Sequence, residues 1–145
     1  MLDDIFQNII NKYLSKKNKK NYYLYFSIFK FLTKSKFILN FKNYKFYASF
    51  DKKSLSRWML KNLKPWDKEN VKKVIYFIKK YNGSFVDCGC NFGAYSIPIA
   101  KEFEDQNIYA FDASKKAIHK LEQNIDLNKL ININYFNIGI GDKNT

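Results

Sequence analysis

Cysteine and histidine are scarce in this chain of 145 residues. It has two cysteines, Cys88 and Cys90, and one histidine, His119. One residue separates the cysteines, too close for a disulfide of normal geometry, so a disulfide framework is excluded and we expect a reducing compartment. A zinc site needs about four ligands, which this set cannot supply. We therefore expect no bound metal, and we interpret both cysteines as small buried packing residues.

Long hydrophobic runs are also missing from the N-terminal part. Residues 21–29 form the longest uncharged apolar stretch there, far short of the ~20 residues that span a bilayer. Asp3 and Asp4 stand where a secretory signal would carry basic residues, and no apolar segment of the right kind follows. These features predict a cytoplasmic protein.

Glycine is absent from the first 82 residues, and the charge changes at the same place. Residues 1–80 hold 20 basic and 5 acidic side chains, a net charge of +15, whereas residues 81–145 hold 6 and 8, a net charge of −2. The two regions 1–82 and 83–145 therefore differ in character. All five glycines fall in the second: Gly83, Gly89, Gly93, Gly139 and Gly141.

The sequence of the basic, aromatic region 1–82 predicts helices and a hairpin. Hydrophobic spacing predicts helices over 2–14, 22–33 and 54–63, and a hairpin over 37–50. A further helix is expected after Asp67, which we predict to cap it. Three interpretations of this region stay open. It packs as a cap on the following domain, it docks on an anionic membrane or an acidic substrate, or it contacts nucleic acid. No known nucleic-acid-binding motif supports the third interpretation.

After residue 82 the pattern alternates between strand and helix. Strands are expected over 84–88, 107–111 and 133–138, with a helix over 94–103 and another that Ser114 caps. Such alternation implies parallel β-α-β units. The predicted fold class is α/β, a Rossmann-like parallel sheet that contains the first three strands only, preceded by a helical and hairpin N-terminal cap.

The segment over residues 85–96 is the most informative part of the sequence, because it runs from an apolar strand through a glycine-bearing turn into a helix. Gly89 would let ligand atoms approach the backbone, and Asn91 adopts left-handed conformations at a lower cost than most residues. Gly93 would allow close packing of helix on strand. In open α/β sheets, ligands bind beside the carboxyl ends of the strands, which is where this turn is expected to lie.

Two acidic residues mark the ends of the first two strands and indicate the ligand. Asp112 follows the second strand, where it could accept hydrogen bonds from ribose hydroxyls. The dinucleotide fingerprint needs glycine at positions that here hold Gly89, Asn91 and Ala94, so only the first matches. Asp87 would repel a pyrophosphate but suits a ligand with an amino group and a sulfonium. The charges thus favour S-adenosylmethionine over NAD.

Five segments together match a known pattern, at residues 85–93, 95–96, 110–112, 124–128 and 139–142. In them the sequence resembles the FkbM-type family of S-adenosylmethionine-dependent methyltransferases. The resemblance implies that Asp87, Gly89, Asn91 and Gly93 line the methionine side of the cofactor and that Asp112 holds the ribose. The chain departs from the family in having Asp112-Ala113 where Glu-Pro is usual, and Cys90 in place of alanine.

The same resemblance implies a strand order of 3-2-1-4-5 and further strands after the third. Since the sequence stops at Thr145, we expect a fragment of a longer enzyme. The implied reaction is methyl transfer to an oxygen of a small molecule, sugar or glycolipid, and no catalytic base can be named. Two alternatives remain: a nucleotide-binding oxidoreductase fragment, or a non-enzymatic basic module that docks on membrane or RNA.

Overall fold

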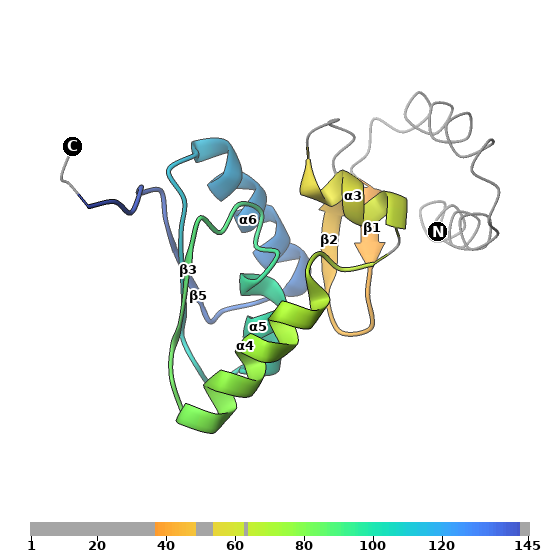
Figure 1. The fold of residues 1–145 in the computed structure, drawn as a ribbon. Coiled ribbons are helices and arrows are strands. Elements are labelled where there is room, and N and C mark those ends of the chain that lie inside the picture. Colours follow the sequence, from red (N-terminus) through yellow and green to blue (C-terminus); the bar gives the residue numbers. More distant parts are fainter. Residues whose placement is uncertain (1–36, 49–53, 63, 143–145) are drawn as a thin grey trace, which may run out of the picture.

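The computed structural model describes residues 37–48, 54–62 and 64–142 (Figure 1). A parallel sheet with three helices beside it forms one part of the fold, and a two-stranded hairpin with a short helix forms the other. The helices predicted over 2–14 and 22–33 lie outside the described residues.

The sheet has three parallel strands, as predicted. They are β3 (Phe85–Cys88), β4 (Ile108–Phe111) and β5 (Ile133–Phe136), in the spatial order β3-β4-β5. This is the order expected for the first three strands of the predicted sheet. Phe85 lies opposite Ile108, which in turn lies opposite Ile133. The carboxyl ends of all three strands therefore meet at one edge.

Helices lie on one side of this sheet (Figure 1), namely α4 (Lys68–Tyr81), α5 (Ser96–Glu102) and α6 (Lys115–Asn128). Side chains of β3 alternate accordingly: Phe85 and Asp87 are half-buried, whereas Val86 and Cys88 are exposed. The prediction that both cysteines are buried is thus wrong for Cys88, because alternate residues of a strand point to opposite faces. Cys90, past the strand end, is buried as expected.

The core beside the sheet comes mainly from α5 and α6. On α6 the predicted apolar stripe is buried, and Ser114 caps the helix by accepting a hydrogen bond from the backbone N–H of Ala117 at 3.3 Å. α5 is buried along most of its length, including Pro98, which lies in its first turn where a missing N–H costs little. The stripe on α6 consists of Ala117, Ile118, Leu121 and Ile125.

The hairpin predicted over 37–50 is present in the described range. β1 (Phe37–Asn40) pairs antiparallel with β2 (Lys45–Ala48), and α3 (Leu55–Asn62) packs on β2. Phe46 is almost fully buried and meets the ring of Phe92 edge-on, with 5.3 Å between ring centroids. The hairpin and the sheet therefore share one hydrophobic core.

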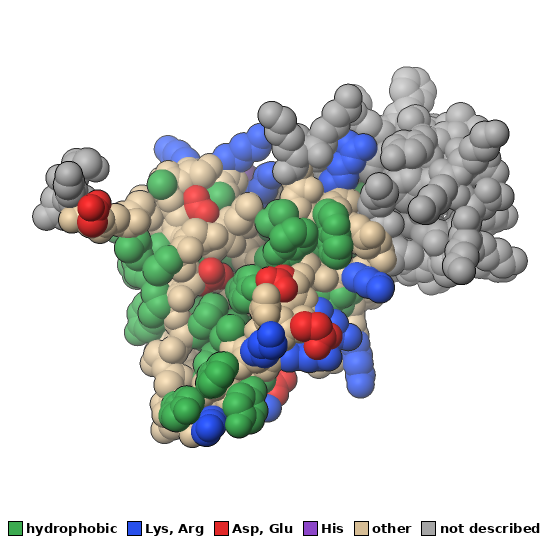
Figure 2. Space-filling model, in the orientation of Figure 1, with side chains coloured by type: hydrophobic (Ala, Val, Ile, Leu, Met, Phe, Trp, Pro, Cys, Tyr) green, Lys and Arg blue, Asp and Glu red, His purple; other side chains and the backbone are tan. Residues whose placement is uncertain are grey.

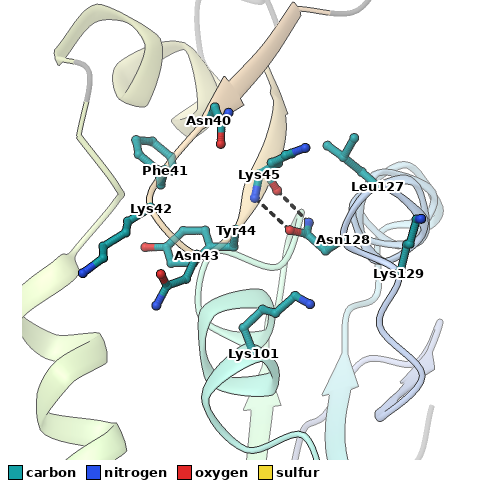
Figure 3. A pocket seen from close by; sticks show the side chains of 10 residues that line it. All are labelled: Asn40, Phe41, Lys42, Asn43, Tyr44, Lys45, Lys101, Leu127, Asn128 and Lys129. Atoms are coloured by element: carbon teal, nitrogen blue, oxygen red, sulfur yellow. Dashed lines mark hydrogen bonds between the residues drawn. The ribbon is translucent and has the colours of Figure 1, made fainter.

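Two asparagines on α6 hold the outer edge of β2. The Asn128 side chain accepts a hydrogen bond from the Lys45 N–H at 2.8 Å and donates one to the Lys45 carbonyl at 2.7 Å (Figure 3). One helical turn earlier, the Asn124 carbonyl oxygen accepts from the Tyr47 N–H at 2.8 Å. Residues four apart on a helix thus match backbone groups two apart on a strand, and the strand edge is satisfied by side chains.

Asn128→Ala should therefore destabilise the fold and loosen the hairpin. The change leaves the backbone groups of Lys45 without partners, which costs about 1–3 kcal/mol of unfolding free energy. Denaturant unfolding measures the loss, and hydrogen exchange should show faster exchange of the Lys45 amide. Asn134→Ala is the control, because Asn134 is exposed and its side chain donates a hydrogen bond to the exposed side chain of Asn107 and not to backbone. Equal stability of the two variants would contradict this account.

A cavity of 270 Å³ lies beside the hairpin turn and the C-terminal end of α6. Four lysines line it, Lys42, Lys45, Lys101 and Lys129, together with Asn128 and five other residues (Figure 3). Because α6 runs from the end of β4 back to the start of β5, this cavity lies at the amino edge of the sheet. Lysines around a helix C-terminus complement the negative end of the helix dipole.

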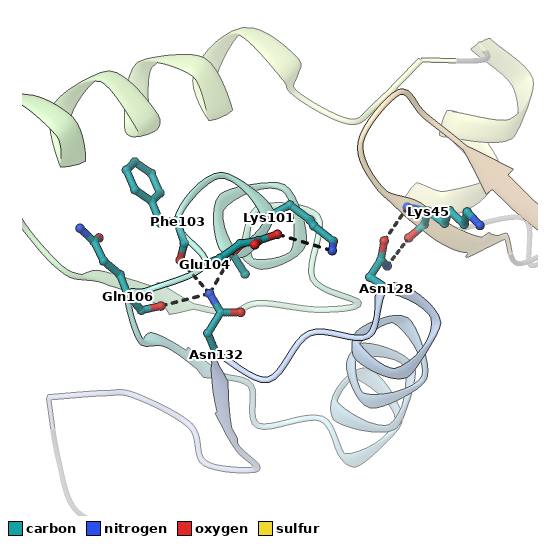
Figure 4. A network of polar contacts seen from close by, with 8 residues as sticks. Lys45, Lys101, Phe103, Glu104, Gln106, Asn128 and Asn132 are labelled. Atoms are coloured by element: carbon teal, nitrogen blue, oxygen red, sulfur yellow. Dashed lines mark hydrogen bonds and ion pairs between the residues drawn. The ribbon is translucent and has the colours of Figure 1, made fainter.

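Asn132 fixes the loop that enters β4 from the same amino edge. Its buried side-chain amide donates to the carbonyls of Ala100, Phe103 and Gln106 at 2.8–3.1 Å (Figure 4). Nearby, Lys101 pairs with Glu104 at 3.9 Å. Within the described ranges, no helix has the length and apolar character needed to cross a bilayer.

Candidate functional site

The loop after β3 makes a tight crook at the carboxyl edge of the sheet. Its backbone enters the left-handed region three times, at Gly89 (φ +85°), Asn91 (φ +52°) and Gly93 (φ +89°). A Cβ on Gly93 would lie 2.6 Å from a methyl of Leu121 and 2.9 Å from Ile97, so only glycine fits there. A Cβ on Gly89 would meet nothing within 4 Å, so that glycine leaves open space along the backbone.

Asp112 connects the crook to the loop that follows β4. One of its carboxylate oxygens accepts a hydrogen bond from the Asn91 N–H at 2.9 Å, and the other accepts from the Ser114 N–H at 2.8 Å. The predicted ribose ligand therefore lies directly against the predicted methionine-side loop. A carboxylate has about four acceptor positions, so two remain for hydroxyl groups of a ligand.

Asp87 is a half-buried acid at this edge. Burial raises the pKa of its carboxyl above the ordinary value, although hydrogen bonds from Ser96 act in the opposite direction, and the charge of Asp112 raises it further. The Ser96 hydroxyl donates to the Asp87 carboxylate at 2.5 Å. Among the described residues, neither Asp87 nor Asp112 has a lysine or arginine as ion-pair partner.

Backbone hydrogen bonds of Gly89 and Cys90 attach the crook to the neighbouring strand. The backbone N–H groups of Gly89 and Cys90 both donate to the carbonyl of Phe111, at 2.8 and 3.0 Å, and so fasten the crook to β4. Burial, together with the charges of Asp87 and Asp112, raises the pKa of the Cys90 thiol to about 12, which makes it a poor nucleophile. No group of three or more metal-ligating side chains occurs in the part of the chain that the structure describes.

Asp67 also reaches the motif, which the sequence did not predict. It is the N-cap residue of α4, as predicted, but its side chain makes no cap hydrogen bond. Instead, the carboxylate accepts from the Tyr95 hydroxyl at 2.5 Å and from the Asn70 amide at 2.9 Å. These bonds lower the pKa of Asp67, while burial and Asp67 raise that of Tyr95 to about 12. No local pattern links positions 67 and 95.

All five predicted site residues thus meet at one edge. Asp87 lies on β3 just before the crook, Gly89, Asn91 and Gly93 lie in it, and Asp112 is bonded to it. Two carboxylates thus lie beside open backbone at this edge, and no ion pair links either of them to a basic side chain of the described ranges. Such an arrangement favours a ligand that carries positive charge and hydroxyl groups over one that carries phosphates.

The comparisons with known proteins point to a class. No family model matches the sequence. A tRNA(Phe) (4-demethylwyosine(37)-C(7)) aminocarboxypropyltransferase of Methanocaldococcus jannaschii is 36% identical over 70 residues, which are 47% of this chain and 28% of that protein. The crystal structure of M. jannaschii TYW2 in complex with AdoMet aligns with a TM-score of 0.50 and 27% identity, over 71% of this chain and 43% of that chain.

A coclaurine N-methyltransferase bound to N-methylheliamine and SAH aligns with a TM-score of 0.40 and 14% identity, over 93% of this chain and 45% of that chain, a likeness too low to bear on function. This chain spans less than half the length of the proteins that it matches. The described elements form a partial Rossmann-like fold of the class I S-adenosylmethionine-dependent methyltransferases, as predicted. The narrower resemblance to the FkbM-type family stays a prediction.

Proposed function

We propose that this chain has the cofactor site of an S-adenosylmethionine-dependent transferase, and that the crook after β3 binds S-adenosylmethionine. The single observation that carries the proposal is the bond between the Asn91 N–H and Asp112, because it joins the two predicted halves of the cofactor site. The predicted cofactor is also the ligand named for the TYW2 neighbour.

The charges in the crook fit this donor. S-adenosylmethionine has an ammonium group and a sulfonium, and we assign the half-buried carboxylate of Asp87 to its methionine side. Asp112 can accept the ribose hydroxyls through its remaining acceptor positions. A pyrophosphate would meet both carboxylates without a compensating lysine or arginine among the described residues. This disfavours NAD and hence an oxidoreductase.

The proposed reaction is methyl transfer to an oxygen of a small molecule, sugar or glycolipid, in keeping with the FkbM-type resemblance. When bound, S-adenosylmethionine supplies an electrophilic carbon next to a sulfonium leaving group. The described residues contribute binding and orientation of that carbon, which is a large part of catalysis in such transfers. The 36% identity to an aminocarboxypropyltransferase favours a second candidate, transfer of the aminocarboxypropyl group.

Two labelled forms of the donor distinguish these reactions. S-adenosylmethionine labelled in the methyl group, or in the carboxyl group of its methionine part, is incubated with the chain and with small-molecule, glycolipid and RNA fractions of the source cells. We expect incorporation from the methyl label only, with S-adenosylhomocysteine as the second product. Incorporation of the carboxyl label, with release of 5′-methylthioadenosine, would instead establish the second candidate. Incorporation of neither label would contradict both.

A further inference from the structure

The solvent-facing side of α4 carries three large aromatic side chains near its C-terminal end. Tyr76, Phe77 and Tyr81 are 58%, 53% and 66% exposed. The opposite side of the helix supplies its core contacts, through Val71 and Ile78. Figure 2 shows hydrophobic side chains gathered, with lysines among them, at the lower end of the molecule, where the C-terminal end of α4 lies in Figure 1.

Contacts among these rings make a single apolar surface. Tyr76 and Phe77 meet edge-on with 5.5 Å between centroids, and Phe77 stacks on Tyr81 at 6.2 Å with 9° between ring planes. Single exposed hydrophobic residues are ordinary on protein surfaces, whereas grouped ones mark interaction sites. Since α4 already packs on the core through its other side, these rings are available to a partner.

Positive charge surrounds the rings. α4 contains five lysines and one glutamate. Lys72 pairs with Glu69 and Lys79 pairs with Glu102. Lys80 instead lies over the rings of Tyr76 and Tyr81, at 5.8 and 5.2 Å from their centroids, and has no carboxylate partner among the described residues. A partner of this surface therefore offers negative charge next to an apolar layer.

Lys73 is exposed and lies one helical turn before Tyr76 and Phe77. We propose that the aromatic and basic surface of α4, formed by Tyr76, Phe77, Tyr81, Lys73 and Lys80, docks on a bilayer that contains anionic phospholipid. Tyrosine rings favour the headgroup level, and lysines gain energy from a negatively charged leaflet. The surface is the outer side of one helix and so is convex. Single-stranded nucleic acid is usually held in a basic groove, and the lysine-lined cavity of this chain lies at the C-terminal end of α6.

Co-sedimentation with vesicles tests the docking. Vesicles of phosphatidylcholine and phosphatidylserine, in a ratio of roughly three to one, are compared with vesicles of phosphatidylcholine alone. We expect the chain to bind the anionic vesicles at least about tenfold more strongly. Binding that does not depend on phosphatidylserine, or no binding at all, would overturn the proposal. Because residues 1–36 are also basic and aromatic, variants of α4 provide the decisive comparison.

A variant with Tyr76→Ser, Phe77→Ser and Tyr81→Ser should lose most of this binding, a fall of about tenfold or more. Its matched control exchanges three exposed isoleucines elsewhere, Ile131→Ser, Ile138→Ser and Ile140→Ser, and should bind as the unaltered chain does. Unchanged circular dichroism would show that both variants fold. Vesicle binding that persists in the α4 variant would overturn the proposal.

Exchange of charge gives an independent test of the same surface. Lys73→Glu with Lys80→Glu should abolish the preference for phosphatidylserine, whereas Lys115→Glu with Lys116→Glu, at the start of α6, should leave it intact. If the α4 variants instead lose binding to a single-stranded RNA, with vesicles never bound, the surface is a nucleic-acid interface. If they abolish self-association in gel filtration, again with vesicles never bound, it is a contact between copies. Either result would contradict docking on a bilayer.

Discussion

Gly93→Ala is expected to lower the free energy of unfolding by about 2–5 kcal/mol. A left-handed backbone costs a residue with a side chain roughly 1–2 kcal/mol, and overpacking of a core costs roughly 1–3 kcal/mol. Both terms apply at Gly93, because its φ is +89° and a Cβ would lie 2.6 Å from a buried methyl of Leu121. Chemical denaturation monitored by circular dichroism measures the change.

The neighbouring glycine separates packing from ligand binding. The added methyl of Gly89→Ala meets no atom within 4 Å, so the change should cost only about 1–2 kcal/mol of strain. The methyl would, however, occupy the open space in which we propose that the ligand approaches the backbone. We expect this variant to fold and to lose affinity for S-adenosylhomocysteine. Gly141→Ala is the control for Gly93→Ala and Gly89→Ala, since a Cβ on Gly141 would meet no atom within 4 Å and the φ of Gly141 is not positive. The account is wrong if Gly93→Ala and Gly141→Ala are equally stable.

Asp87→Asn is expected to weaken binding of S-adenosylmethionine about 10- to 100-fold, and at the same time to stabilise the chain without ligand at neutral pH. The binding loss follows from removal of a charge-assisted contact to the ammonium side of the donor. The gain in stability follows from burial, which raises the pKa of this carboxyl because the ionised form is disfavoured in the fold. The asparagine keeps an oxygen that can accept the Ser96 hydroxyl bond.

The pH dependence follows from the direction of that shift. A carboxyl whose folded-state pKa is raised penalises folding only where it is ionised. The penalty is therefore absent below the ordinary pKa of about 3.9 and complete above the raised value. The advantage of Asp87→Asn in thermal unfolding should shrink as the pH falls from 7 through this window. Calorimetry for binding and thermal unfolding at several pH values measure both effects.

Asp105→Asn is the matched control, because this exposed carboxylate lies in the loop between α5 and β4, away from the carboxyl edge of the sheet. Asp105→Asn should change neither the affinity for S-adenosylmethionine nor the dependence of thermal unfolding on pH. If Asp87→Asn keeps full affinity, or lowers stability at neutral pH, then Asp87 is an ordinary structural residue and the cofactor site has been misplaced.

The sequence was sufficient to predict the elements whose local pattern is strong. β3, its glycine crook and the capped helix α6 each carry a signal within a few residues, and the shared edge of Asp87 and Asp112 follows from parallel strands. Contacts between distant segments left no such signal. The hydrogen bond from Tyr95 to Asp67 joins residues 28 positions apart, and the hydrogen bonds between Asn128 and Lys45 join residues 83 positions apart. The prediction that Cys88 is buried is wrong because the alternation of side chains along β3, and not the residue type, determines its exposure.

The central claim is that the carboxylates at the ends of β3 and β4 bind a positively charged adenosyl donor. Calorimetric titration of the chain with S-adenosylmethionine and with NAD, each repeated with Asp87→Asn, tests it most directly. Heat of binding with S-adenosylmethionine that falls in the variant, and none with NAD, is the predicted result. Tighter binding of NAD, or no heat with S-adenosylmethionine from the folded chain, would contradict the claim.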